Sequence, residues 1–124
     1  MKAFSDLEQS KKLAEFLPIE SADMYWWSSG KRYYIEAMDD GDFNEEEGHI
    51  RAWSLAALIN IIPQELFDGE YIINITEGID NKWIITYDHY ENRNHSFYGL
   101  SAGADNLVDA CYEMIIKLHE LNLL

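Results

Sequence analysis

The chain has 124 residues, a length typical of one domain, and 48% of them are hydrophobic and 14% aromatic. This composition supplies a packed core and excludes a disordered chain. The 23 acidic and nine basic side chains give a formal net charge of −14. A field of that sign repels phosphate backbones and anionic lipids, so neither direct nucleic-acid binding nor membrane binding is expected.

Signals for secretion or membrane insertion are not found along the chain. Residues 1–8 mix charges and lack the apolar segment of a secretory signal. The longest apolar stretch is far shorter than the roughly 20 residues that span a bilayer. Cys111 is the single cysteine and cannot form an internal disulfide. These features predict a cytoplasmic protein.

The first part of the chain predicts a helix followed by a hairpin. Ser5, with Glu8 three positions later, matches a capping box, so a helix is expected at about residues 6–16. Aromatic and apolar runs at residues 24–27 and 33–38 flank a Ser-Ser-Gly-Lys turn. Such a pattern is typical of two antiparallel strands.

The middle of the chain predicts an acidic loop and a second helix. Residues 39–48 contain two glycines and six acidic residues with no basic residue, which favours a solvated loop. Ser54 is a natural N-cap for a helix over residues 55–62, and Pro63 ends it. Because this segment is apolar almost all round, the helix is expected to be buried on most sides.

The last part of the chain predicts a meander and a third helix. Three runs of β-branched and aromatic residues, at 71–76, 82–88 and 96–100, are separated by polar turns. The glycine-containing residues 99–105 are interpreted as a strand-to-helix turn. A helix follows from Asn106, since apolar residues recur after it with helical spacing.

The order α-β-β-α-β-β-β-α predicts one α+β domain over residues 1–124, with an antiparallel sheet of about five strands and helices packed on one face. From Leu55 onward this order is similar to that of double-stranded RNA-binding domains. Those domains grip phosphates with lysines at the last helix, where this chain carries Asp105, Asp109 and Glu113. Any likeness would therefore concern the fold and not the activity.

The acidic loop contains part of a calcium-binding pattern. Asp40, Asp42 and Asn44 have the spacing of the first three EF-hand ligands. Glu45 then stands where glycine is needed, and Arg51 stands where a bidentate glutamate is needed. The pattern predicts a solvated charged loop, with weak binding of divalent cations as the alternative.

Catalytic and metal-binding groups form no recognisable set. His89 and His95 would face each other across a turn between two strands, and they are the basis of a metal-dependent enzyme hypothesis. Cys111 lies on the apolar helical face and is expected in the core. Ser54 is better explained as a helix cap than as a nucleophile. No catalytic residue, metal site or cofactor is predicted.

Partner-binding candidates are the aromatic residues of the hairpin and the carboxylates of the acidic loop. They are Tyr25, Trp26, Trp27, Tyr33, Tyr34, Asp39, Asp40, Asp42, Glu45, Glu46 and Glu47. Strand alternation buries only about half of such aromatic residues on one sheet face, so the others would mark a partner surface. Core packing on both faces is the alternative, and the sequence favours neither.

Three stretches resemble a known group of proteins. They are Ser-Ala-Asp-Met-Tyr at residues 21–25, Ile-Arg-Ala-Trp-Ser-Leu-Ala-Ala-Leu at 50–58 with Pro63, and Asp-Asn-Leu-Val-Asp-Ala at 105–110 leading to Glu113 and Met114. They resemble small uncharacterised proteins of gut anaerobic bacteria and of their phages and mobile elements. The resemblance implies a bacterial accessory role and carries no activity to any residue. Arg51 differs from the small residue or proline expected there.

Three functional hypotheses follow. The first is a non-catalytic accessory protein that acts by protein interaction or regulation. The second is a nucleic-acid mimic or inhibitor of a basic DNA- or RNA-binding protein, because residues 1–38 carry six acids and five bases and leave −13 for residues 39–124. The third is the metal-dependent enzyme. A basic protein partner is expected, and a homodimer is left open.

Overall fold

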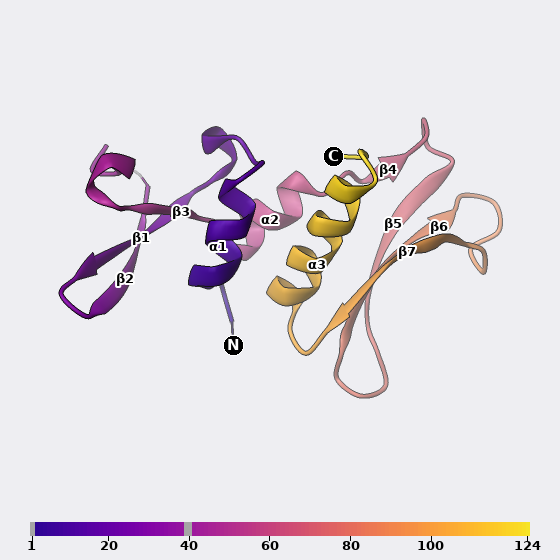
Figure 1. The fold of residues 1–124 in the computed structure, drawn as a ribbon. Helices are drawn as coiled ribbons and strands as arrows, with labels where there is room; N and C mark the ends of the chain where they lie inside the picture. Colours follow the sequence, from indigo (N-terminus) through magenta and orange to yellow (C-terminus); the bar gives the residue numbers. More distant parts are fainter. Residues whose placement is uncertain (1, 39–40) are drawn as a thin grey trace.

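A computed structural model describes residues 2–38 and 41–124, which form two β-sheets with three helices between them (Figure 1). The helices are α1 (Leu7–Ala14), α2 (Leu55–Ile61) and α3 (Leu107–Glu120), with 3-10 turns η1 (Ile19–Ser21) and η2 (Glu45–Glu47). The strands are β1 (Met24–Ser29), β2 (Arg32–Ala37), β3 (Ile50–Ala52), β4 (Glu65–Leu66), β5 (Tyr71–Glu77), β6 (Trp83–His89) and β7 (Ser96–Ala104). None of the helices in these residues has the length and apolar character needed to cross a bilayer.

The α+β class is confirmed, but the prediction of a single sheet of about five strands is wrong. One antiparallel sheet has the order β2-β1-β3 and the other the order β4-β5-β6-β7. The strands β3 and β4 are too short to show a hydrophobic period, so the sequence did not reveal them. Because β3 pairs with β1, with Arg51 opposite Tyr25, the first sheet is complete before the chain enters α2.

The predicted hairpin and meander are both confirmed. A two-residue turn joins β1 to β2. It contains Gly30 at φ +67°, a backbone conformation that residues other than glycine rarely adopt. The strands β5, β6 and β7 are antiparallel neighbours. β7 continues to Ala104, so the interpretation of residues 99–105 as a turn is wrong. Gly99, at φ +78°, lies where the register with β6 shifts, and the strand resumes after it.

The helix N-termini are capped by short polar residues. In α1 the cap is Asp6, one residue after the predicted Ser5: its carboxylate accepts from the backbone N–H of Gln9 at 2.8 Å, and the Gln9 side chain accepts from the N–H of Asp6 at 3.1 Å. Ser54 caps α2 as predicted. Asn106 caps α3, accepting from the third N–H of the helix at 2.9 Å.

The second helix is buried on one side only, contrary to prediction. Leu58 is fully buried, whereas Ile59 is 40% exposed and Ala56 is also exposed. α2 packs against α3 on its buried side. A helix of seven residues covered by one neighbour leaves its other side in solvent, however apolar its sequence.

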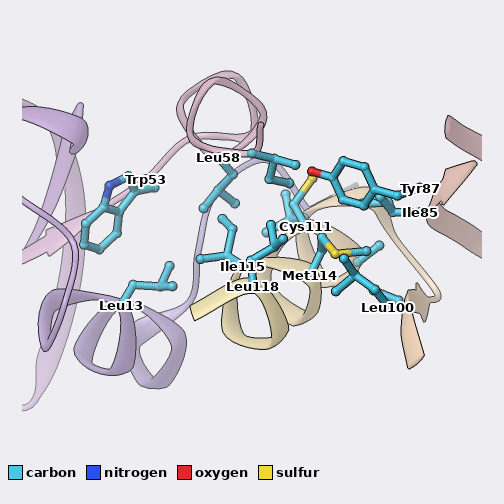
Figure 2. Close-up of a cluster of buried hydrophobic side chains, with 14 of the residues drawn as sticks. Leu13, Trp53, Leu58, Ile85, Tyr87, Leu100, Cys111, Met114, Ile115 and Leu118 are labelled. Carbon is cyan, nitrogen blue, oxygen red and sulfur yellow. The ribbon is translucent and has the colours of Figure 1, made fainter. Parts of the chain in front are cut away.

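The core lies between α3 and the second sheet and continues to α1 (Figure 2). The buried face of α3 agrees with the predicted one in the middle of the helix, where Cys111, Met114 and Leu118 are inaccessible to solvent, whereas Leu121 at its end is 50% exposed. Across from α3 the sheet contributes Ile85 and Tyr87. This packing confirms Cys111 as a core residue.

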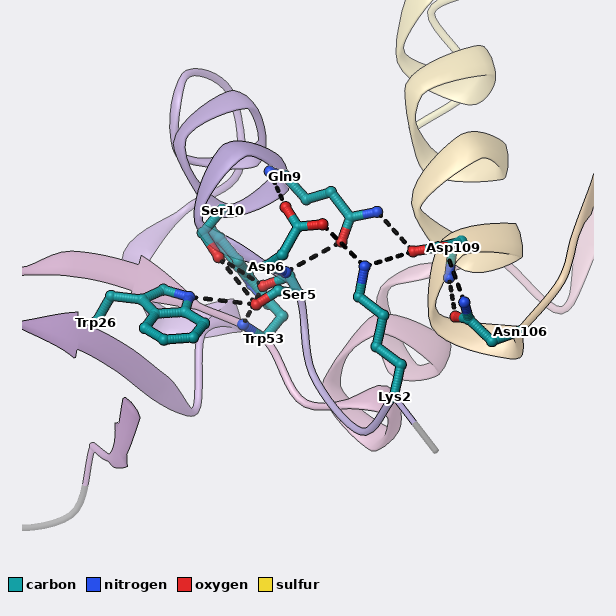
Figure 3. A network of polar contacts seen from close by, with 9 residues as sticks. All are labelled: Lys2, Ser5, Asp6, Gln9, Ser10, Trp26, Trp53, Asn106 and Asp109. Carbon is teal, nitrogen blue, oxygen red and sulfur yellow. Dashed lines mark hydrogen bonds and ion pairs between the residues drawn. The ribbon is translucent and has the colours of Figure 1, made fainter. Parts of the chain in front are cut away.

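Trp53 joins the amino-terminal segment to the first sheet. Its backbone C=O accepts from the N–H of Ser5 at 2.8 Å, and its backbone N–H donates to Ser5 Oγ at 3.0 Å (Figure 3). Its indole N–H donates to Ser21 Oγ at 3.0 Å, and the side chain is fully buried. Ser5 in turn bonds to Ser10 of α1, so four segments meet at one tryptophan.

A polar network joins the amino terminus to α3 (Figure 3). Lys2 Nζ lies 2.6 Å from Asp109 Oδ1 and 2.9 Å from Asp6 Oδ2. Asp109 also accepts from Gln9 Nε2 and Asn106 Nδ2, each at 2.8 Å. Burial opposes ionisation of Asp109, but the hydrogen bonds from Lys2, Gln9 and Asn106 outweigh it and lower the pKa of this carboxyl.

Asp88 joins three strands on the face of the second sheet that points away from α3. Its carboxylate accepts hydrogen bonds from Asn74 of β5 at 2.9 Å, Thr86 of β6 at 2.9 Å and Ser96 of β7 at 2.8 Å. Burial opposes its ionisation, and these three bonds more than offset that effect, so its pKa is lowered. The interaction fixes the register of the sheet.

The roles of Trp53 and Trp27 predict opposite responses to one substitution. Trp53→Phe removes a buried hydrogen bond and leaves Ser21 with one partner fewer, so we expect a loss of about 1–3 kcal/mol in the free energy of unfolding. Trp27→Phe removes a buried N–H that has no acceptor within the described residues, so we expect a loss below about 1 kcal/mol. Urea unfolding followed by circular dichroism measures both. Equal losses would contradict the assigned role of Trp53.

The network around Asp109 predicts a pH-dependent contribution to stability. Since the pKa of Asp109 is lower folded than unfolded, its contribution is complete above the unfolded value and is lost as the pH falls through the folded value. Asp109→Asn is expected to cost about 1 kcal/mol at neutral pH, allowing for solvent screening, and almost nothing well below about pH 4. The measurement is urea unfolding at several pH values. Glu20→Gln, at an exposed position, is the control, and a difference independent of pH would contradict the prediction.

Candidate functional site

The hairpin divides its aromatic residues between two sheet faces. Trp26 is on the face toward the amino terminus, where its indole N–H donates to the C=O of Ser5 at 3.2 Å and its ring meets the ring of Phe4 edge-on at 5.7 Å. Tyr33 is on the same face but farther out, and it is 47% exposed. Trp26 therefore serves packing, and Tyr33 is accessible.

Tyr25, on the opposite face, is covered by the acidic loop. Its side chain is 4% exposed. The ring stacks on His49 with centroids 5.1 Å apart and meets Phe43 edge-on at 5.7 Å. Its hydroxyl donates to Glu36 Oε2 at 3.1 Å. Tyr25 is thus an anchor for the loop, and the hypothesis of an exposed partner-binding residue is wrong at this position because the loop folds over it.

Trp27 and Tyr34 form a stacked pair beside Tyr25 on the same face. Their ring centroids are 4.8 Å apart and the ring planes differ by 27°. Tyr34 is 41% exposed and Trp27 is half-buried. Within the described residues, Trp27 Nε1 is a buried donor without an acceptor. Unsatisfied buried donors are uncommon in protein cores because they cost free energy, so Trp27 is less well satisfied here than the buried tryptophan Trp53.

The acidic loop has a defined structure between Phe43 and His49. Asn44 Oδ1 accepts from the N–H of Glu46 at 2.9 Å and so caps η2. The N–H of Asn44 donates to His49 Nδ1 at 3.0 Å, and Gly48 closes the turn in the left-handed region at φ +85°. The prediction of a simple solvated loop holds for the carboxylates and not for the backbone.

The carboxylates of this loop point into solvent. Asp42, Glu45, Glu46 and Glu47 are all exposed, while the predicted candidates Asp39 and Asp40 lie outside the described residues. Glu45 Oε1 lies 2.8 Å from Arg51 Nε, which stabilises one end of the loop. The loop thus presents negative charge at the border of the face that carries Trp27 and Tyr34.

Phe43 and His49 were not among the predicted site residues, although they determine how the loop lies. Their rings contact Tyr25, and they contact each other with centroids 6.2 Å apart. The signal available in the sequence was Phe43 itself, the single large apolar residue in a run of charges. An apolar side chain in such a run indicates a loop that packs on something.

The histidine pair is brought together as expected but is not arranged as a metal site. The N–H of His89 donates to the C=O of His95 at 2.8 Å, and both residues line a hollow of about 350 Å³. His89 Nδ1 accepts from the N–H of Glu91 at 3.2 Å, so the neutral ring carries its proton on Nε2. Among residues 2–38 and 41–124, no group of three or more potential ligands of the His, Cys, Asp and Glu types is close enough to hold a metal ion.

The two candidate nucleophiles have structural roles. Ser54 Oγ donates to the Asp23 carboxylate and accepts from the N–H of Ala57 at 3.2 Å. Cys111 is fully buried, and burial raises the pKa of its thiol to about 11. At neutral pH such a thiol is protonated and inaccessible.

Comparison with known proteins adds no relative: no protein-family model, curated protein or solved structure matches the chain significantly. The candidate functional surface of the chain is formed by Trp27, Tyr34 and the exposed carboxylates of the acidic loop.

The burial of Cys111 predicts an unreactive thiol. In the native protein at neutral pH, we expect a disulfide reagent such as Ellman's reagent to react at least about a thousand times more slowly than with the chain unfolded in guanidinium chloride. Absorbance of the released thiolate measures the rate. Rapid stoichiometric reaction without loss of helical circular dichroism would contradict the assigned burial.

Proposed function

We propose that this protein is a non-catalytic accessory that binds a basic region of a partner protein through the hairpin surface, defined as Trp27, Tyr34 and the carboxylates of Asp42 and Glu45–Glu47. The observation that carries the proposal is the position of the stacked pair. It lies on the same sheet face as Tyr25, which the acidic loop covers, so exposed aromatic area and exposed negative charge adjoin.

This combination fits the energetics of protein recognition. Tryptophan and tyrosine supply large, rigid contact areas and are frequent at the centres of interfaces. Charged groups at the rim add little to affinity but accelerate association with an oppositely charged partner. The net charge of −14 extends that attraction beyond the site.

A nucleic-acid mimic is a narrower form of the same proposal. In that case the basic partner is itself a DNA- or RNA-binding protein, and the carboxylates occupy its phosphate sites. The three consecutive carboxylates of η2 and the charge of −13 over residues 39–124 favour this form.

Affinity capture followed by titration tests the proposal. The tagged chain is incubated with a lysate of the organism that encodes it, and a captured protein is purified and titrated calorimetrically. We expect a basic partner whose Kd rises about 30-fold or more with Trp27→Ala/Tyr34→Ala, because two central aromatic residues are lost. Glu46→Gln/Glu47→Gln is expected to slow association and weaken its salt dependence.

Tyr90→Ala is the matched control, because Tyr90 is 51% exposed on the second sheet's side of the molecule. It should leave the Kd unchanged. Displacement of DNA or RNA from the purified partner would identify the mimic. An acidic partner, or a Kd that the hairpin variants do not change, would refute the proposed surface.

A further inference from the structure

The strand β7 leaves a long edge of the second sheet open. It pairs with β6 on one side, and no other strand of the described residues lies on its other side. With nine residues it is the longest strand, whereas β4 at the opposite edge has two. Long open edges are usually shortened or covered, because their free N–H and C=O groups pair with other chains.

The hydrogen-bond pattern identifies which groups of β7 face outward. The N–H of Gly78 donates to the C=O of Lys82 at 2.6 Å, which fixes the alternation of hydrogen bonds along β6. The backbone groups of its even-numbered residues bond to β5, and those of its odd-numbered residues bond to β7. In the register with β6, the backbone N–H and C=O groups of Ala102 and Ala104 therefore point toward β6. Those of Ser101 and Gly103 point away from the sheet, toward the open edge. Independently, Lys117 Nζ donates to the C=O of Ser101 at 2.5 Å, as only an outward carbonyl allows.

A groove runs beside this edge. It has a volume of about 400 Å³ and lies between residues 102–104 of β7 and the side of α3 that carries Asp109, Glu113 and Lys117. The small side chains of Ala102 and Ala104 leave room between strand and helix. An added strand would find backbone partners on one side and the helix on its face, the arrangement of peptide recognition by strand addition.

We propose that this edge and groove are a docking site for an extended basic segment of a partner protein, which adds to the second sheet as a strand beside β7. Lys117 covers the Ser101 carbonyl in the free protein and leaves it when an incoming N–H takes its place. This site is separate from the hairpin surface, which belongs to the other sheet.

Charge selects the occupant. The groove carries two lysines, of which Lys117 moves away on binding, and three carboxylates, of which Asp109 is already paired with Lys2. Asp105 and Glu113 are exposed and take part in no ion pair within the described residues. A second copy of this chain would bring a further charge of −14 to the same edge, which opposes pairing of two β7 strands.

A synthetic peptide tests the proposal with the full chain. The probe is a fluorescein-labelled peptide of alternating lysine and valine, about seven residues long, the length of an ordinary strand. Fluorescence anisotropy is expected to show saturable binding. N-methylation of one alternate set of residues should abolish it and methylation of the other set should not, because only one edge of an added strand pairs with β7. Equal binding by all three peptides would show charge attraction alone and overturn the proposal.

Lys117→Met and Gly103→Pro are expected to change the Kd of the probe in opposite directions. Lys117→Met frees the Ser101 carbonyl and should lower the Kd of the probe about tenfold. Lys82→Met makes the same charge change in the same groove without touching that carbonyl, so it is the control and should have a smaller effect. Gly103→Pro removes an outward N–H and should raise the Kd about tenfold, the free energy of one hydrogen bond.

Gly103→Ala is the control for the proline variant. A Cβ there would lie 3.7 Å from the C=O of Trp83, an ordinary contact, so this variant should bind like the wild type. If Gly103→Pro does not fold, the methylated peptides and the comparison of Lys117→Met with Lys82→Met still test the proposal. Equal effects of Lys117→Met and Lys82→Met would overturn the proposal, and so would a dimer in light scattering that Lys117→Met strengthens. Trp27→Ala/Tyr34→Ala should leave peptide binding unchanged, which separates this site from the hairpin surface.

Discussion

The pair of backbone and side-chain hydrogen bonds between Ser5 and Trp53 is the contact on which the first half of the molecule depends. Residues 3–5 lie antiparallel to residues 53–55, with Phe4 opposite Ser54 and the N–H of Leu55 donating to the C=O of Ala3. This short pairing holds α1 against the first sheet at the point where the chain leaves β3 for α2. Because Trp53 is fully buried there, the polar contacts lie in a low dielectric and are strengthened by it.

Two sheets with separate covering elements give the molecule two unlike surfaces. The first sheet is covered by α1 on one face and partly by the acidic loop on the other, which leaves the Trp27–Tyr34 pair open. The second sheet is covered on one face by α3, and Asp88 joins its three long strands, while the edge of β7 is left without a neighbouring strand among the described residues. Both surfaces carry negative charge, but they differ in the groups that would contact a partner. The hairpin surface offers aromatic rings, and the edge of β7 offers backbone N–H and C=O groups.

The sequence was informative where a local rule decides the structure. Ser54 and Asn106 begin helices because their side chains satisfy free N–H groups, and most of the apolar period of α3 is buried in the core. It was uninformative where pairing at a distance decides. Three residues of β3 become a strand only because β1 is beside them, and the position of the loop follows from Phe43 meeting Tyr25. Nothing in the local pattern distinguishes Tyr25, which is covered, from Tyr34, which is open.

The ion pair between Lys2 and Asp109 joins residues 107 positions apart. During synthesis, Lys2 is made long before Asp109 and the helix α3 that carries it. Residues 3–5 can pair with residues 53–55 as soon as these have been made, but the attachment of Lys2 to α3 has to wait until α3 itself has been made. Until α3 has been made, the apolar side of α2 that α3 covers stays open to solvent and to chaperones.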